Sequence, residues 1–404
     1  MITVELLRGN LFMEEELYKI EQVFERMMTE KVFVIEDRNA SYHSYTKIYP
    51  RTVKTLLRKV NEKFGIQQMN ELTKVMMYQM IDERIDNYHT NLDFSESHNI
   101  TAILSAMRAY QKGVMEFGIY ETWEEINYDE LREYVKENKV KRRGASSLTM
   151  RAMPEEALAV IEILKNEGNK VENRKLVADM AIVAVATGAR ISSLYKLRKC
   201  DIDLDKGICH FINAKGGKDY DANIDPDFKD ELSRIIRGKD DDERLFVWKK
   251  KNGQFMSLEK VTETVNYYIR RATANMKKQQ QTLYTDAEGN KSYVKIVTKF
   301  TFHSFRKAYA FKRLVYYLMQ FTSFKIMRSW QTEVVSKYPH ALTKLNALYK
   351  RANKGRKGKW RELRLEEYAI FAASLDLGHE RNDVIGQFYA DLKSAKRYVK
   401  QISV

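Results

Sequence analysis

The residues best suited to chemistry lie in short stretches spread over the second half of the chain. Arg190 follows Thr-Gly-Ala after a strongly apolar run, and His303 and Arg306 stand three residues apart. Residues at that spacing share one helix face, so both side chains can point at one phosphate. His379 follows Leu-Gly, and Tyr389 ends the run Gln-Phe-Tyr. Each stretch alone also fits a structural role, because a buried arginine can serve a salt bridge and a tyrosine can be a core ring.

Two lysines lie between a pair of short alternating segments. Residues 208–212 and 220–224 alternate in polarity, which is typical of strands, and Lys215-Gly-Gly-Lys218 between them suits a tight hairpin turn. Lysines at such a tip can reach into a groove as flexible point charges. A solvated turn explains the same residues when they are taken alone.

The charge balance points to polyanionic partners. The 404 residues include 70 Lys and Arg against 55 Asp and Glu, a net charge of +15, and 44% of residues are hydrophobic. This excess favours nucleic acid, although an indifferent basic surface gives the same number. We expect no membrane span and no signal peptide, and we read the two cysteines, Cys200 and Cys209, as reduced structural thiols in a cytoplasm.

The chain divides into several predicted domains and helices, which must position these residues. We expect an N-terminal helical, DNA-binding domain over 1–138, with extra helices in 1–48, and a basic linker over 139–150. A catalytic domain over 151–390 follows, and 391–404 forms a short basic tail helix. Further helices are predicted at 52–64 after Pro50, 70–88, 95–117, 154–164, 174–186 and 261–272, and a second hairpin with strands at 282–284 and 293–297. Gly188 suits a left-handed cap at the end of the helix 174–186.

The order of these stretches resembles that of the tyrosine recombinase, or phage integrase, family. Thr-Gly-Ala-Arg190, a hairpin lysine, His303-x-x-Arg306, Leu-Gly-His379 and Tyr389 occur in the family's order, and the likeness covers roughly residues 50–390. The resemblance implies a mainly α fold with a small antiparallel β-sheet. It also implies a clamp made of a helical core-binding domain and an α/β catalytic domain.

The resemblance assigns a role to each of these residues. Tyr389 would attack the scissile phosphorus and form a 3′-phosphotyrosyl link, and Arg190 and Arg306 would hold the non-bridging oxygens. Lys215 would protonate the departing 5′-oxygen, His303 would act as acid and base, and His379 would hydrogen-bond the phosphoryl group. A phenol with a pKa of about 10 needs such cationic surroundings to react at neutral pH. No metal or other cofactor is implied.

Several assignments stay open. Lys218 is the alternative to Lys215 as the catalytic lysine. The position of Lys215 at the end of the predicted strand favours Lys215. The gap from His379 to Tyr389 is one residue longer than is commonest in the family, so Tyr398 and Tyr368 remain alternative nucleophiles. The segment 321–370 is a basic insertion relative to compact members, and its role is open. We expect DNA-binding residues in the linker, the hairpin tip and the insertion, namely Lys139, Lys141, Arg142, Arg143, Lys218, Lys354, Arg356, Lys357 and Lys359.

The predicted function is site-specific recombination of duplex DNA, as in integration, excision or resolution of a mobile element, phage or plasmid. A telomere resolvase or a type IB topoisomerase-like strand transferase is the enzymatic alternative, and a catalytically inactive DNA-binding protein is the other. The resemblance implies double-stranded DNA with specific recombination sites, a homo-tetramer held through the C-terminal tail, and an accessory directionality factor. We expect a cytoplasmic, nucleoid-associated protein of a prokaryotic host.

Overall fold

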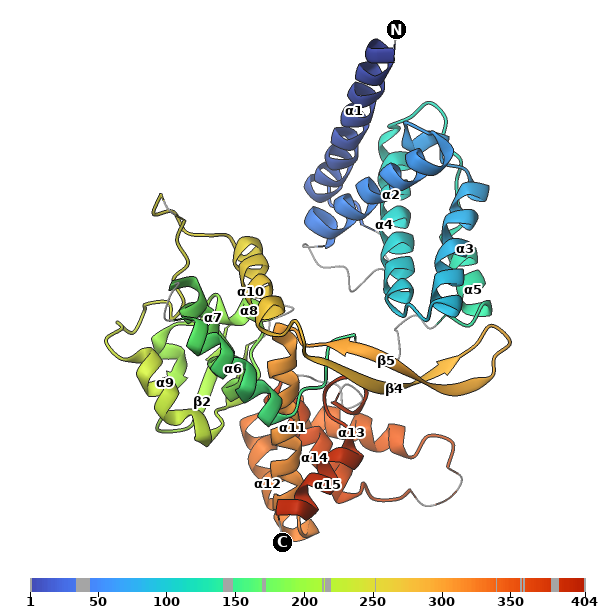
Figure 1. The fold of residues 1–404 in the computed structure, drawn as a ribbon. Coiled ribbons are helices and arrows are strands. Elements are labelled where there is room, and N and C mark those ends of the chain that lie inside the picture. The colour runs from blue at the N-terminus through green and yellow to red at the C-terminus, as the bar shows by residue number, and fades with distance from the viewer. Residues whose placement is uncertain are drawn as a thin grey trace. The chain divides into compact units, whose positions relative to one another are not determined.

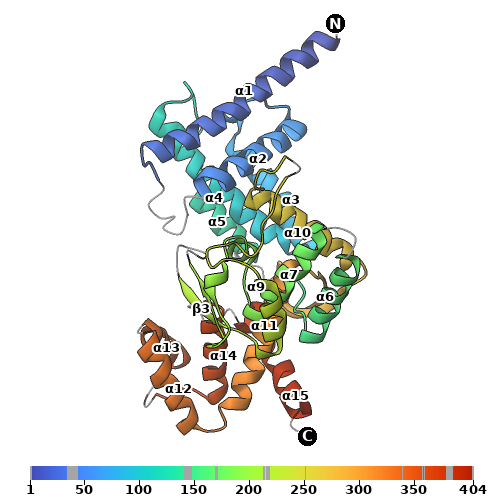
Figure 2. The same ribbon diagram turned by 90° about the vertical axis from the view of Figure 1, so that its left-hand side faces the viewer.

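The computed structural model describes residues 2–33, 44–140, 148–168, 172–212, 214, 219–250, 252–338, 340–356, 358, 360–378 and 385–402. These residues form two compact units. The first comprises Met1–Ser146 and Gln281–Lys295, and the second comprises Ser147–Gln280 and Ile296–Val404 (Figure 1, Figure 2). Within the described ranges, no helix is both long and apolar enough to cross a bilayer.

The first unit is a bundle of helices. Its elements are α1 (Ile2–Thr29), a π-helical turn at Ser44–Ile48, α2 (Tyr49–Phe64), a 3-10 turn at Met69–Glu71, α3 (Lys74–Thr90), α4 (Ser95–Phe117) and α5 (Tyr128–Glu137). The helix α4 has the predicted bounds, and it packs against α1, α2, α3 and α5. Gly113 allows this close approach, because a Cβ there would lie 2.7 Å from the side chains of Val23 and Met27.

The distal part of the second hairpin packs with this helical unit. Tyr284 lies among the rings of Tyr88 and Phe94, with ring centroids 6.2 Å and 5.9 Å away. Its hydroxyl lies 2.6 Å from Nδ1 of His89, whose Nε2 lies 2.8 Å from the carbonyl oxygen of Asn138. Because a carbonyl can only accept, Nε2 carries the proton and donates it. One histidine therefore joins the hairpin to the end of α5.

The second unit combines helices with a three-stranded antiparallel sheet and with the inner ends of a two-stranded one. Its helices are α6 (Pro154–Gly168), α7 (Glu172–Thr187), α8 (Ile191–Leu194), α9 (Lys229–Ile236), α10 (Leu258–Ala272), α11 (Phe302–Gln320), α12 (Phe324–Lys337), α13 (His340–Ala352), α14 (Leu365–Asp376) and α15 (Leu392–Ile402), with 3-10 turns at Lys199–Asp201 and Pro226–Phe228 and a π-helical turn at Ile385–Tyr389. This architecture confirms the predicted mainly α fold with small antiparallel sheets.

The sheets follow the predicted hairpins. The strands β1 (Ile202–Asp203), β2 (Ile208–Phe211) and β3 (Tyr220–Asn223) form one sheet in the order β1-β2-β3. In its second ladder Cys209 is paired with Ala222 and His210 with Asp221. The strands β4 (Lys277–Thr285) and β5 (Lys291–Lys299) form the other, and both are longer than predicted because the polar alternation of their outer residues is weak.

Two helices form the centre of the second unit. From Ala181 to Ala189 every side chain of α7 and its cap is buried, as the all-round apolar sequence predicts. The helix α11 packs against α6, α7, α14 and α15 and against the turn that carries Tyr389. Two basic residues of α11 are also buried: Arg306 and Lys307 are 0% and 1% exposed.

The insertion contains more regular structure than the sequence indicated. The helices α12 and α13 fill most of residues 324–352, and α5 and α9 were likewise not predicted. Part of the basic run at 350–361 is helical, since Lys350 and Arg351 lie in the last turn of α13. The run also has a counter-charge, because Arg361 pairs with Glu367. These helices are polar on a wide face, so a search for apolar periodicity misses them.

Gly188 lies at the point where three elements of the second unit meet. Its φ is +69°, and an added Cβ would lie 2.5 Å from the ring of Tyr309 and 2.8 Å from the side chain of Leu377. We expect Gly188→Ala to lower the free energy of unfolding by about 3 kcal/mol, because left-handed strain and overpacking add. Urea denaturation measures this loss.

Gly207 provides the matched control in the same unit. It has a similar φ of +66°, but nothing lies within 4 Å of its added Cβ. Gly207→Ala should cost about 1 kcal/mol, the conformational strain alone. Equal losses in the two variants would contradict the packing argument for Gly188.

Lys307 is a buried lysine of α11 whose amine contacts the first residues of the second unit. Its Nζ donates to the carbonyl oxygen of Thr149 over 2.7 Å, beside the bridge that pairs Thr149 with Lys299. Burial, to which the charge of Arg151 adds, lowers the pKa of Lys307 to about 7. A neutral amine can still donate this hydrogen bond, so the contact is compatible with loss of the charge.

This depressed pKa makes stability depend on pH. Between pH 7 and the ordinary value of 10.5, the unfolded chain holds a proton that the folded chain has lost. The free energy of unfolding therefore rises with pH across this window, by up to about 1.4 kcal/mol per pH unit. We expect Lys307→Met to remove this rise in urea denaturation. The exposed Lys325→Met is the control, and a parent-like rise in Lys307→Met would contradict the assignment.

Candidate functional site

Four of the residues singled out from the sequence meet in the second unit. Arg190, His303, Arg306 and Tyr389 come from the cap of α8, from α11 and from the π-helical turn, and they converge on the Tyr389 side chain. The Tyr389 side chain is buried, with 5% of its surface exposed. The site therefore gathers two guanidinium groups and an imidazole around one phenol.

The Arg306 guanidinium is the most enclosed group of the site. Its Nε donates to the hydroxyl of Tyr389 over 3.4 Å, and its Nη2 donates to the carbonyl oxygen of Leu377 over 2.6 Å. Its Nη1 donates to the carbonyl oxygen of Gly188. Three of its five N–H groups thus join three segments that are distant in sequence. Loss of the planar donor set would release all three.

Arg190 contacts the same phenol. It hydrogen-bonds the Tyr389 side chain, and it stands at the first position before α8, where Thr187 and Gly188 end α7. Burial, followed by the positive charge of Arg306, lowers the pKa of the Arg190 guanidinium, and Tyr389 partly offsets this effect. Arg190 and Arg306 are neighbouring cations that repel each other, so binding of an anion between them is strongly favoured.

Packing at two glycines brings the separate motifs together. Gly188 contacts Tyr309 of α11 and Leu377 at the end of α14, as described above. Gly378 has a φ of +60°, and an added Cβ would lie 2.7 Å from the ring of Tyr220 on β3. The sequence could not reveal that Tyr220 packs on Gly378. The alternation of β3 predicts which of its side chains share a face, but it does not predict which distant segment they contact.

His303 lies against Tyr389 on the predicted face of α11. The two ring centroids are 5.4 Å apart at an interplanar angle of 62°. The other tyrosines that the sequence left open lie elsewhere. Tyr398 donates to Glu155 over 2.8 Å and contacts Phe311, and Tyr368 is a buried residue of α14. Of the three candidates, Tyr389 is the one that contacts both Arg190 and Arg306.

Several predicted residues lie outside the described part of the chain. They are the hairpin lysines, the second histidine and most of the linker and insertion cations, namely Lys215, Lys218, His379, Lys141, Arg142, Arg143, Lys357 and Lys359. Their predicted roles therefore remain expectations from the sequence. Lys139, Lys354 and Arg356 are described, and all three are exposed.

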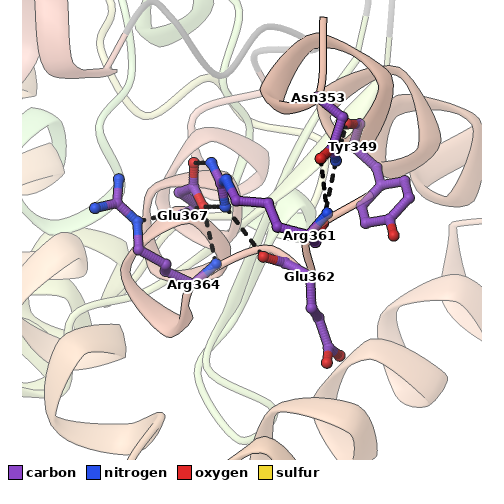
Figure 3. Close-up of polar contacts among 6 residues, drawn as sticks. All are labelled: Tyr349, Asn353, Arg361, Glu362, Arg364 and Glu367. Atoms are coloured by element: carbon purple, nitrogen blue, oxygen red, sulfur yellow. Dashed lines mark hydrogen bonds and ion pairs between the residues drawn. The ribbon is translucent and has the colours of Figure 1, made fainter. Parts of the chain in front are cut away.

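The basic loop after α13 is fastened at its base (Figure 3). Asn353, which is 2% exposed, accepts from the backbone N–H of Arg361 over 2.8 Å and donates to its carbonyl oxygen over 3.1 Å. The Arg361 guanidinium forms a two-point pair with Glu367, with both N–O distances 2.7 Å. This pinned base holds Lys354 and Arg356 in a short loop rather than on a free chain.

A cavity of about 530 Å³ opens beside the site. Arg190 and Tyr220 form part of its wall, and Trp330 and Tyr338 contribute from the insertion helix α12. On its α14 side, Asp376 binds Arg313 over 2.5 Å and accepts from Asn223 of β3 over 2.7 Å. The insertion therefore forms one wall of a space that reaches the site.

Comparison with known proteins shows a family-model match within this unit. Residues 151–315 match the model of the phage integrase family. The tyrosine recombinase XerA of Pyrococcus furiosus is 28% identical over 176 residues, which cover 43% of this chain and 54% of that protein. The match thus spans about half the length of the curated relative.

Solved structures give weaker likenesses. A Tn1549 transposon integrase in complex with transposon right end DNA has 13% identity and a TM-score of 0.43, with 95% of this chain and 99% of that chain covered. The lambda integrase, residues 75–356, bound to DNA has 15% identity and a TM-score of 0.41, with 72% and 85% covered. Residues 151–315 of this chain are thus similar to the phage integrase family, and the curated relative that the chain matches over 176 residues is a tyrosine recombinase.

Proposed function

We propose that the protein is a site-specific DNA recombinase that cuts and rejoins duplex DNA through a phosphotyrosine. One observation carries the proposal, namely that the Tyr389 hydroxyl is held by Arg190 and Arg306 with the His303 ring against it. The match of residues 151–315 to the phage integrase family model supports the reaction class. Integration or excision of a mobile element is the biological role we favour.

The arrangement suits attack by a phenol on a phosphodiester. A phosphate bound between Arg190 and Arg306 would take over the donors that now hold the Tyr389 hydroxyl, leaving the oxygen beside the phosphorus. The bond from Tyr389 Oη to phosphorus forms, the bond to the 5′-oxygen breaks, and a 3′-phosphotyrosyl link results. The two guanidiniums stabilise the charge that gathers on the non-bridging oxygens. Attack by another 5′-hydroxyl reverses the step and joins a new strand.

Proton transfer requires further groups. In our proposal His303 accepts the phenolic proton as general base, and Lys215 gives a proton to the departing 5′-oxygen. His379 hydrogen-bonds the phosphoryl group, and Lys218 is the alternative to Lys215. The residues that flank these groups in sequence include Leu377, whose carbonyl oxygen accepts from Arg306, and Gly378, which packs on Tyr220 of β3.

We further propose that the exposed basic residues bind DNA phosphates. The linker and the pinned loop contribute Lys139, Lys354 and Arg356, and the excess of cations in the whole chain supports a polyanionic partner. A loop closed at its base loses little conformational entropy when it binds, which favours Lys354 and Arg356 as contacts.

Assembly on DNA would use the C-terminal tail. In our proposal protomers form a tetramer on two sites, and α15 contacts a neighbour, with an accessory factor setting direction. In the monomer α15 packs on its own unit through Phe311 and Tyr398, whose ring centroids are 5.6 Å apart, and through an ion pair of Lys396 with Glu366. The helix is strongly amphipathic, so its apolar side needs a partner surface in either arrangement.

The nucleophile can be tested with nicked suicide substrates made from the DNA that flanks the gene. The parent chain should form a covalent protein–DNA adduct on a denaturing gel, and Tyr389→Phe should form none, because phenylalanine has no oxygen to bond phosphorus. Tyr368→Phe and Tyr398→Phe are the controls and should retain the adduct. An adduct that persists in Tyr389→Phe and disappears in either control would refute the assignment.

The phosphate contacts can be tested by the salt dependence of binding. Removing one contact should reduce the slope of log K against log salt by about 0.9. We expect this decrease in Lys354→Ala and again in Arg356→Ala, measured by fluorescence anisotropy with duplex DNA. Lys206→Ala removes an exposed lysine that is paired with Asp203 and should leave the slope unchanged. Unchanged slopes in both loop variants would exclude the loop from the DNA interface.

A further inference from the structure

One carboxylate joins the insertion to the hairpin whose turn contains Lys215. Asp221, on β3, accepts from the Tyr338 hydroxyl over 2.9 Å at one oxygen and lies 2.6 Å from Nδ1 of His210 at the other. Lys337 Nζ lies 3.4 Å from the first of these oxygens. Lys337 is the last residue of α12 and Tyr338 caps it, so the end of this helix is tied to the sheet.

The connection reaches both strands of the hairpin. His210 and Asp221 are directly paired across β2 and β3, so the imidazole and the carboxylate form one cross-strand unit. Burial opposes the charge of Asp221, but the hydrogen bonds from His210 and Tyr338 outweigh this effect and lower the pKa of the carboxyl. A charged acceptor makes stronger hydrogen bonds than a neutral one, which favours a fixed geometry here.

The rest of β3 is held by α14 and the residues that follow it. Asn223 donates to Asp376 at the end of α14 over 2.7 Å, and Tyr220 packs on Gly378. Alternation along the strand places Asp221 on the same face of β3 as Asn223 and on the opposite face from Tyr220. On that shared face Asn223 contacts α14, and Asp221 contacts the end of α12. Without α12, Asp221 would lose its contact with a neighbouring helix.

We propose that α12 is a brace that positions the β2–β3 hairpin, and with it the lysine of its turn, through Tyr338 and Asp221. This inference rests on the proposed function and assigns a role to the insertion. Tyr338 and Asp221 are positioning residues, because they act through the hairpin and touch no reacting atom. The brace fixes the approach of the general acid to the 5′-oxygen and has no part in the attack by Tyr389.

Because the brace acts on the general acid and not on the attack by Tyr389, its loss should affect substrates differently according to their leaving group. Departure of a 5′-oxygen needs a proton, whereas a 5′-sulfur in the bridging position leaves as a thiolate without one. A misplaced general acid therefore slows cleavage of the ordinary phosphodiester and spares the sulfur substrate. A general disturbance of the site slows both.

The test compares the parent chain with Tyr338→Phe and Asp221→Asn on matched suicide substrates that carry oxygen or sulfur at the 5′ bridge. A positioned general acid contributes about 10²- to 10⁴-fold, so we expect cleavage of the oxygen substrate to fall by at least about tenfold and that of the sulfur substrate to change by less than about twofold. Lys215→Ala provides the reference profile for lost protonation. Equal losses on both substrates, or no loss on either, would overturn the proposal.

Two controls complete the design. Tyr316→Phe makes the same chemical change on the wall of the same cavity, where the Tyr316 ring lies 4.4 Å from the Arg313 guanidinium, and it should cleave both substrates as the parent does. Hydrogen exchange of residues 208–223 tests the brace without DNA, and exchange should be faster in Tyr338→Phe than in Tyr316→Phe. If the parent formed no adduct on either substrate, the proposed function would fail, and equal exchange in the two variants would overturn the brace by itself.

Discussion

The second unit depends on a single buried guanidinium. Arg306 has no exposed surface, and it holds the carbonyl oxygens of Gly188 and Leu377 together with the hydroxyl of Tyr389. A buried cation is costly unless its donors are satisfied, so the three segments that supply the acceptors cannot move independently. The same group that we propose stabilises a bound phosphate thus also fixes the relative positions of the turn after α7, the end of α14 and Tyr389.

Because Arg306 contacts both the backbone of distant segments and Tyr389, the short motifs of the site are also structural contacts of the fold. Thr-Gly-Ala, Leu-Gly and Gln-Phe-Tyr are unremarkable as local sequence, and each acquires its meaning from a contact made far along the chain. Gly188 and Gly378 are needed because a ring or a side chain occupies the space of a Cβ. Backbone freedom and close packing thus coincide at the two glycines next to the candidate site.

The sequence was sufficient for the parts of the molecule that local physics determines. One period or one strand rule accounts for the apolar run of α7, the helix α4, the antiparallel pairing of β2 with β3, and the shared helix face of His303 and Arg306. The helices of the insertion escaped notice because they are amphipathic with wide polar faces. The contact of Asp221 with Tyr338 joins residues 117 positions apart, and no local pattern predicts such a pair. The order of the candidate residues was visible in the sequence, whereas their supports were not.

The second hairpin has a consequence for how the protein can be divided. The chain passes between the two units after Ser146, Gln280 and Lys295, so the helical unit contains a segment encoded far downstream. A fragment that ends at Ser146 would lack Tyr284 and would expose the rings of Tyr88 and Phe94 that cover it. Cutting the chain after Ser146 would give two fragments. The larger fragment would keep the β4–β5 hairpin, whose outer part packs in the helical unit of the smaller one. The two units are therefore not separable modules, and a faithful dissection of this protein has to transplant the hairpin together with the helices.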